Sequence, residues 1–247
     1  MTKMNIMKKP SISTIIVIIC ILIIGLYAAG EVNYYSTKIV TERNVDSPVI
    51  SIPKIGVNEK INFESLNQGV LIDPPENVPL EGPIVLYGHR TLQGSPFLRL
   101  NELSAGDKLI LEWPNVGEIE YTVTNSKIVP ATYSGGFEGA SNIYLITCDP
   151  IGSTENRLII EGEFSNQGPV NEQIIRDNPQ ESNALMISGA FLLIGLIFSF
   201  LYPKDNRIYI LVTVLIVSAL LFYFYLNPIP SEIIYDKISF LNGGSFN

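Results

Sequence analysis

Residues 143–162 read IYLITCDPIGSTENRLIIEG, which is two short apolar runs separated by a polar turn. Ile143–Thr147 and Leu158–Gly162 have the composition of β-strands, and Asp149-Pro150 marks the turn between them. On the N-terminal side, further strand-like runs follow one another at near-regular spacing: Pro48–Val57, Gly69–Ile72, Ile84–Tyr87, Lys108–Glu112, Ile119–Val123 and Ser126–Val129. Only Pro96–Leu103 has the pattern of a short helix. Seven or eight short strands therefore predict an all-β domain, either a closed barrel or a sandwich.

Three stretches contain no charged residue and are long enough to cross a membrane: residues 10–30, 182–203 and 208–231. A helix rises about 1.5 Å per residue, so it needs about 20 apolar residues to cross a hydrocarbon core about 30 Å thick. No uncharged stretch between residues 31 and 181 exceeds ten residues. The pattern predicts one N-terminal and two C-terminal transmembrane helices. It excludes a wholly soluble protein and a polytopic transporter with its site at mid-membrane.

The formal net charge of -8 is unevenly distributed along the chain. The N-terminal segment and the 204–207 loop together hold five basic residues and one acidic residue, whereas residues 31–183 hold ten basic and 21 acidic residues. Short loops rich in Lys and Arg stay in the cytoplasm. We therefore expect a multi-pass plasma-membrane protein with a cytoplasmic N-terminus and an extracellular β-domain. A cleaved signal peptide is the alternative, but the apolar core Ile12–Ala29 exceeds the roughly 7–15 residues of a signal h-region.

These patterns divide the chain into eight parts. They are a cytoplasmic N-terminus 1–9, a transmembrane helix 10–30, an approach linker 31–47, the β-domain 48–166, a linker 167–183, transmembrane helices 184–203 and 208–226, and an external tail 227–247. The acidic outer domain argues against nucleic acid and against docking on anionic lipid, because both require basic patches. A protein or the cell envelope is the expected partner.

The chain contains two cysteines, Cys20 and Cys148, and a single histidine, His89. Cys20 lies in the middle of the first membrane window, so it cannot form a disulfide with Cys148. Zinc sites need more Cys and His residues than this, so no metal and no cofactor is predicted. Cys148 is either a small buried hydrophobe or a reactive thiol, and His89 is either a core residue or its partner. Both lie at the ends of strand-like runs, as does Arg157, so a barrel could bring all three to one rim.

Several strings of residues carry a family resemblance, and they occur in family order. They are Ile52–Val57, Gly88-His89-Arg90-Thr91, the scattered Gly94, Phe97, Leu100, Leu103 and Gly106-Asp107, then Leu145–Pro150 and Asn156-Arg157-Leu158. Together they resemble the sortases, membrane-anchored cysteine transpeptidases with an eight-stranded β-barrel, over Pro48–Phe164. The nine-residue step from Cys148 to Arg157 is most similar to the pilin-polymerising class C. Class C enzymes have a single C-terminal span, so the two spans here suggest an atypical or archaeal member.

The resemblance implies roles for three residues. Cys148 would be the nucleophile, His89 its general acid and base, and Arg157 the group that binds substrate and the developing oxyanion. These roles suit the chemistry, because a free thiol needs a cationic neighbour or a base and an oxyanion needs a fixed donor. Thr147 could add a hydrogen bond near the thiol, or it is an ordinary strand residue.

Smaller roles are predicted for the polar residues near these three. Arg90 would point away from His89 along a strand end, which predicts a surface role. Asp149 or Asp73 could orient His89. Asp73-Pro74 is similar to the lid motif of pilin-type sortases, but it lies between strand-like runs, so no lid is expected. Three acids could bind calcium but fit a solvated strand face better: Glu112, Glu118 and Glu120.

The expected function is transpeptidation at the outer membrane face. The enzyme would cleave an LPXTG-like sorting signal near the C-terminus of secreted proteins and transfer the acyl fragment to an amine of a pilin lysine or a cell-wall peptide. Two alternatives stay open. One is an L,D-type cell-wall transpeptidase, although its Ser-His-Gly-Cys run is missing here. The other is a non-enzymatic, membrane-tethered β-domain that binds an envelope partner.

Overall fold

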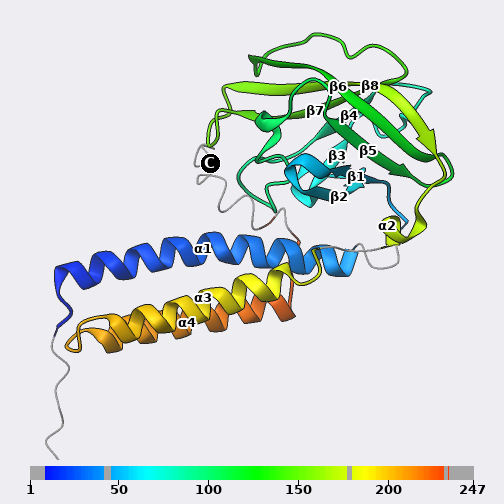
Figure 1. Cartoon of the computed structure of the whole chain (residues 1–247). Helices are drawn as coiled ribbons and strands as arrows, with labels where there is room; N and C mark the ends of the chain where they lie inside the picture. The colour runs from blue at the N-terminus through cyan, green and yellow to red at the C-terminus, as the bar shows by residue number, and fades with distance from the viewer. Residues whose placement is uncertain (1–8, 42–45, 177–179, 231–232, 234–247) are drawn as a thin grey trace, which may run out of the picture.

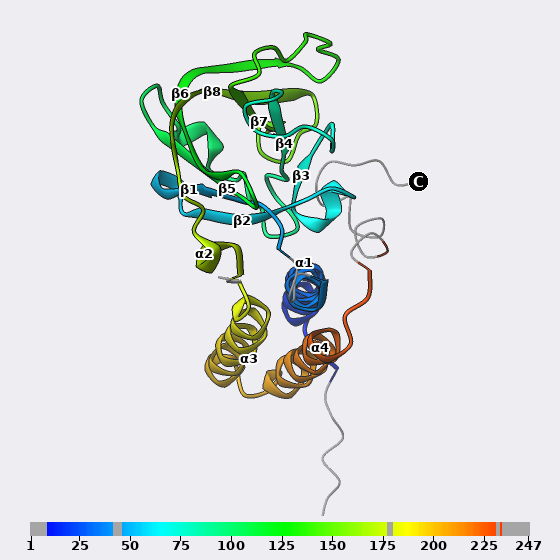
Figure 2. The same ribbon diagram turned by 90° about the vertical axis from the view of Figure 1, so that its right-hand side faces the viewer.

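The computed structural model describes residues 9–41, 46–176, 180–230 and 233. It consists of a β-barrel packed against a bundle of three long helices (Figures 1 and 2). Parts of the N-terminus 1–9, of the approach linker 31–47 and of the tail 227–247 lie outside the described residues. The prediction of a closed barrel with one N-terminal and two C-terminal apolar helices is confirmed.

Eight strands close into the barrel in the order β1-β2-β3-β4-β7-β8-β6-β5. Their bounds are β1 Val49–Ile52, β2 Val57–Asn62, β3 Val70–Ile72, β4 Ile84–Tyr87, β5 Lys108–Trp113, β6 Gly117–Pro130, β7 Asn142–Asp149 and β8 Asn156–Gly168. The pairs β2–β3 and β4–β7 are parallel, and the remaining pairs are antiparallel. The short connecting helices are η1 Pro53–Ile55, η2 Leu66–Gln68, η3 Leu100–Glu102 and α2 Glu172–Arg176. The predicted helix at 96–103 is therefore reduced to the single turn η3.

The barrel core follows from the alternation of apolar residues along the strands. On β6, Ile119, Tyr121 and Val123 are fully buried while the residues between them are less so. Because successive side chains of a strand point to opposite faces, this alternation sends every second residue into the barrel. Burying a large apolar side chain contributes about 1.5–3 kcal/mol relative to exposing it. Buried apolar side chains from all the strands thus form the core inside the barrel.

One of the acidic residues expected on a solvated strand face is buried. Glu112 on β5 is fully buried and accepts a hydrogen bond from the backbone N–H of Asn171 (2.9 Å), just ahead of α2. Burial, together with a contact to Glu118 opposite, raises the pKa of Glu112. Glu120 pairs with Lys108 across the same strands. The prediction of a solvated face was wrong for Glu112 because the segment after β8 covers that part of β5.

Three helices are long and apolar enough to cross a membrane: α1 Ile12–Thr41, α3 Asn183–Leu201 and α4 Arg207–Leu226. Two glycines allow their close packing. A Cβ added to Gly25 would lie 2.5 Å from a methyl group of Val217, and one added to Gly195 would lie 2.5 Å from a methyl group of Val214. Small residues at such contacts let helix backbones approach, which favours helix association in lipid.

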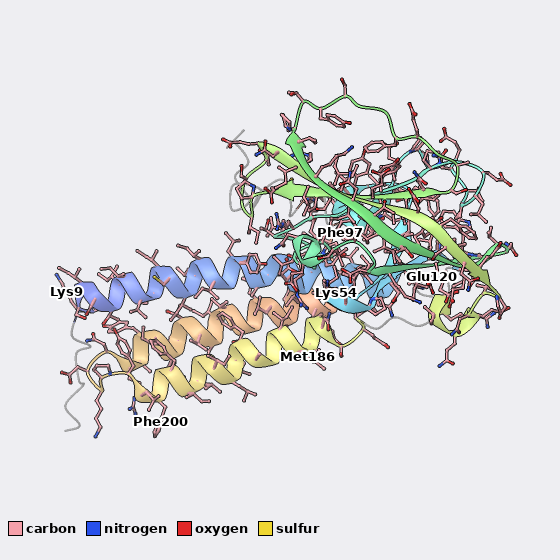
Figure 3. All side chains as sticks on the ribbon, turned by 45° about the horizontal axis from the view of Figure 1, so that its top comes forward. Lys9, Lys54, Phe97, Glu120, Met186 and Phe200 are labelled. Atoms are coloured by element: carbon pink, nitrogen blue, oxygen red, sulfur yellow. The ribbon has the colours of Figure 1, made fainter. Side chains whose placement is uncertain are left out.

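Polar contacts join the start of α1 to the segment between α3 and α4. Far from the barrel, the backbone N–H of Ser11 donates to Asn206 and the hydroxyls of Thr14 and Tyr202 lie 3.2 Å apart. Lys9 and Phe200 mark this end in Figure 3, and Met186 lies nearer the barrel. The α3–α4 loop and the start of α1 therefore share one end of the bundle.

Helix α1 continues well beyond the first membrane window. Its 30 residues make it about 45 Å long, against about 30 Å of hydrocarbon. The approach segment was expected to be a linker because it is polar, but Glu31–Thr41 contains no proline or glycine and continues the helix. The barrel lies beside this second half of α1 (Figure 1). Tertiary packing explains the extension, since residues 28–36 are all buried.

Candidate functional site

Three neighbouring strands bring the predicted site residues to one rim of the barrel. In the antiparallel pair β7–β8, Cys148 lies directly opposite Arg157. Directly opposed side chains on one face of a sheet have Cβ atoms about 4.5–5.5 Å apart. The turn at Asp149-Pro150 therefore returns the chain so that a half-buried thiol faces a half-buried guanidinium.

His89 is held beside the end of β7 by the backbone. Strand β4 runs parallel to β7, and the N–H of Gly88 extends their ladder by donating to the carbonyl of Ile146 (3.1 Å). The carbonyl of Gly88 accepts from the hydroxyl of Thr147 (2.8 Å). The carbonyl of His89 accepts from the N–H of Phe97 (3.1 Å). The ladder and the two hydrogen bonds of Gly88 bring the segment that carries His89 beside the end of β7, where Cys148 follows Thr147, although the two segments are 59 residues apart in the sequence.

The imidazole of His89 is buried, and its environment favours the uncharged ring. Its Nε2 lies 3.4 Å from Oδ1 of Asn67, at η2. Burial lowers the pKa of His89 from 6.5 to about 4. His89 is therefore neutral at physiological pH and can accept a proton from a nearby thiol.

Arg157 is fixed near its own turn. Its Nη1 donates to the carbonyls of Thr154 (2.9 Å) and Asn156 (3.0 Å). Both of these hydrogen bonds use Nη1, so the planar fork is oriented while Nε and Nη2 can still face a substrate. A permanent charge with several fixed donors suits an oxyanion or a carbonyl group.

Thr147 is buried, and its hydroxyl has a defined partner. The donation to the carbonyl of Gly88 joins β7 to the segment that carries His89. The hydroxyl is thus directed across the strands toward the histidine segment. Its contribution to the site is to hold two of the site strands together.

The prediction of a surface role for Arg90 was wrong. Its side chain is 5% exposed, and its guanidinium donates to the carbonyl of Cys148 (3.1 Å), to Oδ1 of Asp149 (2.5 Å) and to Oδ1 of Asn101 (2.7 Å). Arg90 does follow His89 and point elsewhere, as expected, but the segment around η3 covers that side. Asp149 therefore pairs with Arg90 through Oδ1.

Two further polar residues lie at the edge of the site. Tyr87 ends β4, two residues before His89. Burial and the charge of Asp73 raise the pKa of Tyr87, and the charge of Arg157 lowers it. Asp73 therefore acts on the phenol of Tyr87. Sequence reasoning missed Tyr87, although its place two residues before the only histidine could have indicated it.

The second cysteine belongs to the apolar helix bundle. Cys20 lies on α1 and lines an apolar groove between α1, α3 and α4, together with Ile24, Phe191 and Phe198. Both cysteines are free thiols. The only described thiol at the barrel rim is therefore Cys148.

The chain thus combines a closed eight-stranded barrel with a thiol, an imidazole and a guanidinium on the neighbouring strand ends of β4, β7 and β8, a set of groups that suits a cysteine-dependent acyl-transfer enzyme. The model of the sortase domain matches residues 40–165. The chain therefore belongs to the sortase family of cysteine transpeptidases. No curated protein sequence matches the chain.

Solved structures similar to this chain are also sortases. Sortase C of Clostridium perfringens, with the C-terminal cell wall sorting motif, is 25% identical over 48% of this chain and 69% of its own, with a TM-score of 0.43. Sortase C-1 of Actinomyces oris is 28% identical over 49% and 72%, with a TM-score of 0.43. Sortase A of Listeria monocytogenes is 23% identical over 53% and 97%, with a TM-score of 0.44.

Proposed function

We propose that this sortase is a membrane-anchored transpeptidase in which Cys148 is the nucleophile, His89 the general acid and base, and Arg157 the oxyanion and substrate ligand. The observation that carries the proposal is the convergence of these residues at the ends of β4, β7 and β8. Their chemistry is complementary, because the pKa of His89 leaves a neutral base beside the thiol and Arg157 supplies the fixed positive charge.

The first half of the reaction forms a thioester. The Sγ of Cys148 attacks the carbonyl carbon of the scissile peptide bond in an LPXTG-like sorting signal, and His89 takes the thiol proton. Negative charge on the tetrahedral oxygen is stabilised by the guanidinium of Arg157. The C–N bond then breaks, and His89 returns the proton to the leaving amine. The acyl fragment stays on Cys148 as a thioester.

The second half transfers the acyl fragment to an amine. A neutral amine, from a pilin lysine or a cell-wall peptide, attacks the thioester carbonyl and gives its proton to His89. The C–S bond breaks, an amide bond forms, and Cys148 recovers its proton. No oxidant, reductant or cofactor is required by this sequence of steps.

The helix bundle anchors the enzyme on the face where its substrates emerge. Lys9 lies at the bundle end far from the barrel (Figure 3), and the loop that contains Lys204 and Arg207 is joined to the start of α1 by the hydrogen bond from Ser11 to Asn206. These basic residues support a cytoplasmic position for that end. The barrel and the substrates, secreted proteins with a C-terminal sorting signal, then share the outer face. Confining both to one surface raises their effective concentration.

The test is transfer of a sorting-signal peptide to an amine by the full chain in lipid nanodiscs. Cys148→Ala abolishes product while leaving the barrel folded, and Cys20→Ser, the matched change at the other thiol, leaves transfer intact. Transfer by the Cys148→Ala variant would refute the proposal. Use of isolated wall peptide as the acyl donor in place of the sorting peptide would indicate the L,D-type alternative.

The non-enzymatic alternative is tested by alkylation. With Cys20→Ser as background, a thiol reagent reacts with Cys148 at a rate that falls in His89→Ala if the two residues act as a pair. Slow alkylation that is insensitive to His89→Ala would indicate an inert, buried cysteine.

A further inference from the structure

The loop that follows His89 is attached to the outer half of helix α1. The carboxylate of Glu31 accepts hydrogen bonds from the backbone N–H groups of Gln93 (2.8 Å) and Gly94 (2.9 Å). Glu31 is 62 residues upstream of Gln93, yet it reaches the loop only four residues after His89. Glu31, on helix α1, thus binds the backbone of the loop that follows His89.

Neighbours of Glu31 on α1 make the same attachment. Tyr27, one helical turn earlier and on the same face, donates its hydroxyl to the carbonyl of Thr91 (2.8 Å). Gly94 lies so close to the next turn that an added Cβ would be 2.8 Å from Tyr34 and 3.1 Å from Tyr35. The helix therefore contacts this loop through polar groups and through close packing.

The Glu31 contact is buried, and burial raises the pKa of the Glu31 carboxyl while the hydrogen bonds from Gly94 and Gln93 lower it. The side chains of Glu31 and Gln93 are 7% and 5% exposed. Hydrogen bonds to an ionised acceptor are shorter and stronger than neutral ones, and consecutive backbone N–H groups form a concavity that suits an anion. Removing the carboxylate would leave the buried N–H of Gln93 and the partly buried N–H of Gly94 without these partners. An unsatisfied buried donor costs more free energy than a hydrogen bond whose two partners are both removed.

The loop adopts a conformation that needs such support. Gln93, Gly94 and Ser95 have φ angles of 56°, 75° and 46°, so three consecutive residues lie in the left-handed region. That region is unfavourable for residues other than glycine and persists only where surrounding contacts impose it. Without the helix, the loop is free to relax to other backbone conformations.

A change in this loop would be transmitted to His89. The N–H of Phe97 donates to the carbonyl of His89 (3.1 Å), so residues 89–97 form a closed loop with Glu31 bound near its tip. Gly88 and Phe97 are tightly packed, since a Cβ on Gly88 would lie 2.5 Å from the Phe97 ring. On the other side of the imidazole's segment, Nε2 of His89 lies 3.4 Å from Oδ1 of Asn67.

We propose that Glu31 is a positioning residue for transpeptidation: the outer half of the membrane helix α1, through its carboxylate, fixes the loop 89–97 and so the imidazole of His89. The inference rests on the proposed function of His89. It gives α1 a part in catalysis besides anchoring, since α1 would hold the imidazole in position. A displacement of about 1 Å in a catalytic group can reduce a rate by about 10²-fold.

The test compares Glu31→Gln and Glu31→Ala with the wild-type full chain in nanodiscs. Glutamine keeps one acceptor oxygen, so we expect kcat to fall several-fold in Glu31→Gln and tenfold or more in Glu31→Ala, with KM changed less than twofold. His89 is the only histidine, so its ring resonances report its environment directly by NMR. We expect its pKa to rise from about 4 toward 6.5 in Glu31→Ala as the loop opens to water.

Asn33 provides a matched control on the same helix. It also makes two hydrogen bonds to backbone, to the carbonyl (2.8 Å) and the N–H (2.9 Å) of Ile229, but these lie away from the His89 loop. Asn33→Ala therefore lowers the stability of the bundle without changing kcat or the pKa of His89. Equal losses of kcat in Asn33→Ala and Glu31→Ala would overturn the proposal.

Gly94→Ala keeps the inference testable if Glu31→Ala does not fold. It retains the carboxylate but forces the loop off Tyr34 and Tyr35, so kcat falls and the pKa of His89 moves in the same direction. Wild-type kcat and an unchanged His89 pKa in Gly94→Ala would overturn the proposal. The NMR measurement needs no turnover, so it separates failure of this inference from failure of the proposed function.

Discussion

Cys148 on β7 lies directly opposite Arg157 on β8, and the two are nine residues apart along the chain. The antiparallel register, set by a turn between the two strands, places the thiol and the guanidinium on one side of the sheet. This relationship accounts for the spacing seen in the sequence, because a one-residue insertion in either strand would shift the pair onto opposite faces.

Replacing Arg157 tests its role in the transition state. Arg157→Ala should reduce kcat/KM for peptide transfer by about 10²–10³-fold, the usual effect of removing one oxyanion donor. Arg157→Lys should recover only part of this, since lysine keeps the charge but lacks the planar fork. Arg176→Ala, at an exposed arginine on α2, is the control and should leave kcat/KM unchanged. Full activity in Arg157→Ala would contradict the assigned role.

The pKa of His89 gives two linked pH dependences. Because burial lowers this pKa to about 4, the imidazole stays neutral, and the acidic limb of kcat/KM should lie near pH 4 instead of near pH 6.5. Between pH 6.5 and pH 4 the unfolded chain binds a proton that the folded protein does not. The free energy of unfolding should therefore fall as the pH drops through this window, by about 3 kcal/mol in total.

These dependences are measured by NMR titration of the histidine ring and by denaturation at several pH values. His89→Gln serves as the reference, because the difference between its stability curve and that of the wild type isolates the histidine. A titration midpoint at pH 6–7, or parallel stability curves for the two proteins, would be inconsistent with a buried neutral imidazole.

The contact between Arg90 and Asp149 should support both stability and catalysis. Arg90→Met removes the donors to the Cys148 carbonyl and to Asp149, which leaves a partly buried carboxylate unpaired and should cost several kcal/mol. It should also lower kcat, since the backbone of Cys148, the proposed nucleophile, loses a hydrogen bond. Chemical denaturation and steady-state rates check both effects. The exposed pair Arg99–Glu102 is the control, and Arg99→Ala should change neither quantity.

The buried pair between Lys38 on α1 and Glu59 on β2 should be a major link between helix and barrel. Their charged atoms lie 2.6 Å apart, both side chains are almost inaccessible, and Gln180 adds hydrogen bonds to both. Lys38→Met should lower the free energy of unfolding by about 3–5 kcal/mol, because it leaves a buried charge unpaired. The exposed pair Lys54–Asp107 is the control, and Lys54→Met should cost no more than about 1 kcal/mol. Similar losses in both variants would contradict this account.

The strand pattern and the rare residues were predictable from the sequence for clear reasons. Apolar alternation marks strands directly, and the few residues able to do covalent or acid–base chemistry stand at their ends. The parallel pairing of β4 with β7 was not predictable, although it is what brings His89 to Cys148. Pairing between distant strands depends on the closure of the whole barrel.

Residues whose role depends on what covers them were predicted less well. Arg90 was assigned to the surface because alternation gives the direction of a side chain but does not reveal that Asn101 and the η3 segment lie there. The sequence predicts that Glu31 lies in a linker, because polar residues follow the apolar stretch 10–30. Its position inside a continuous helix, bound to backbone four residues after His89, depends on tertiary packing that local sequence does not encode.

Intact-mass measurement shows whether Cys148 carries the acyl fragment. The full chain with Cys20→Ser is incubated with a sorting-signal peptide in the absence of an acceptor amine, then fragmented. We predict a mass increase equal to the acyl fragment, located on Cys148 and removed by hydroxylamine as expected for a thioester. Cleavage of the peptide without any adduct on Cys148, or an adduct on another residue, would contradict the account.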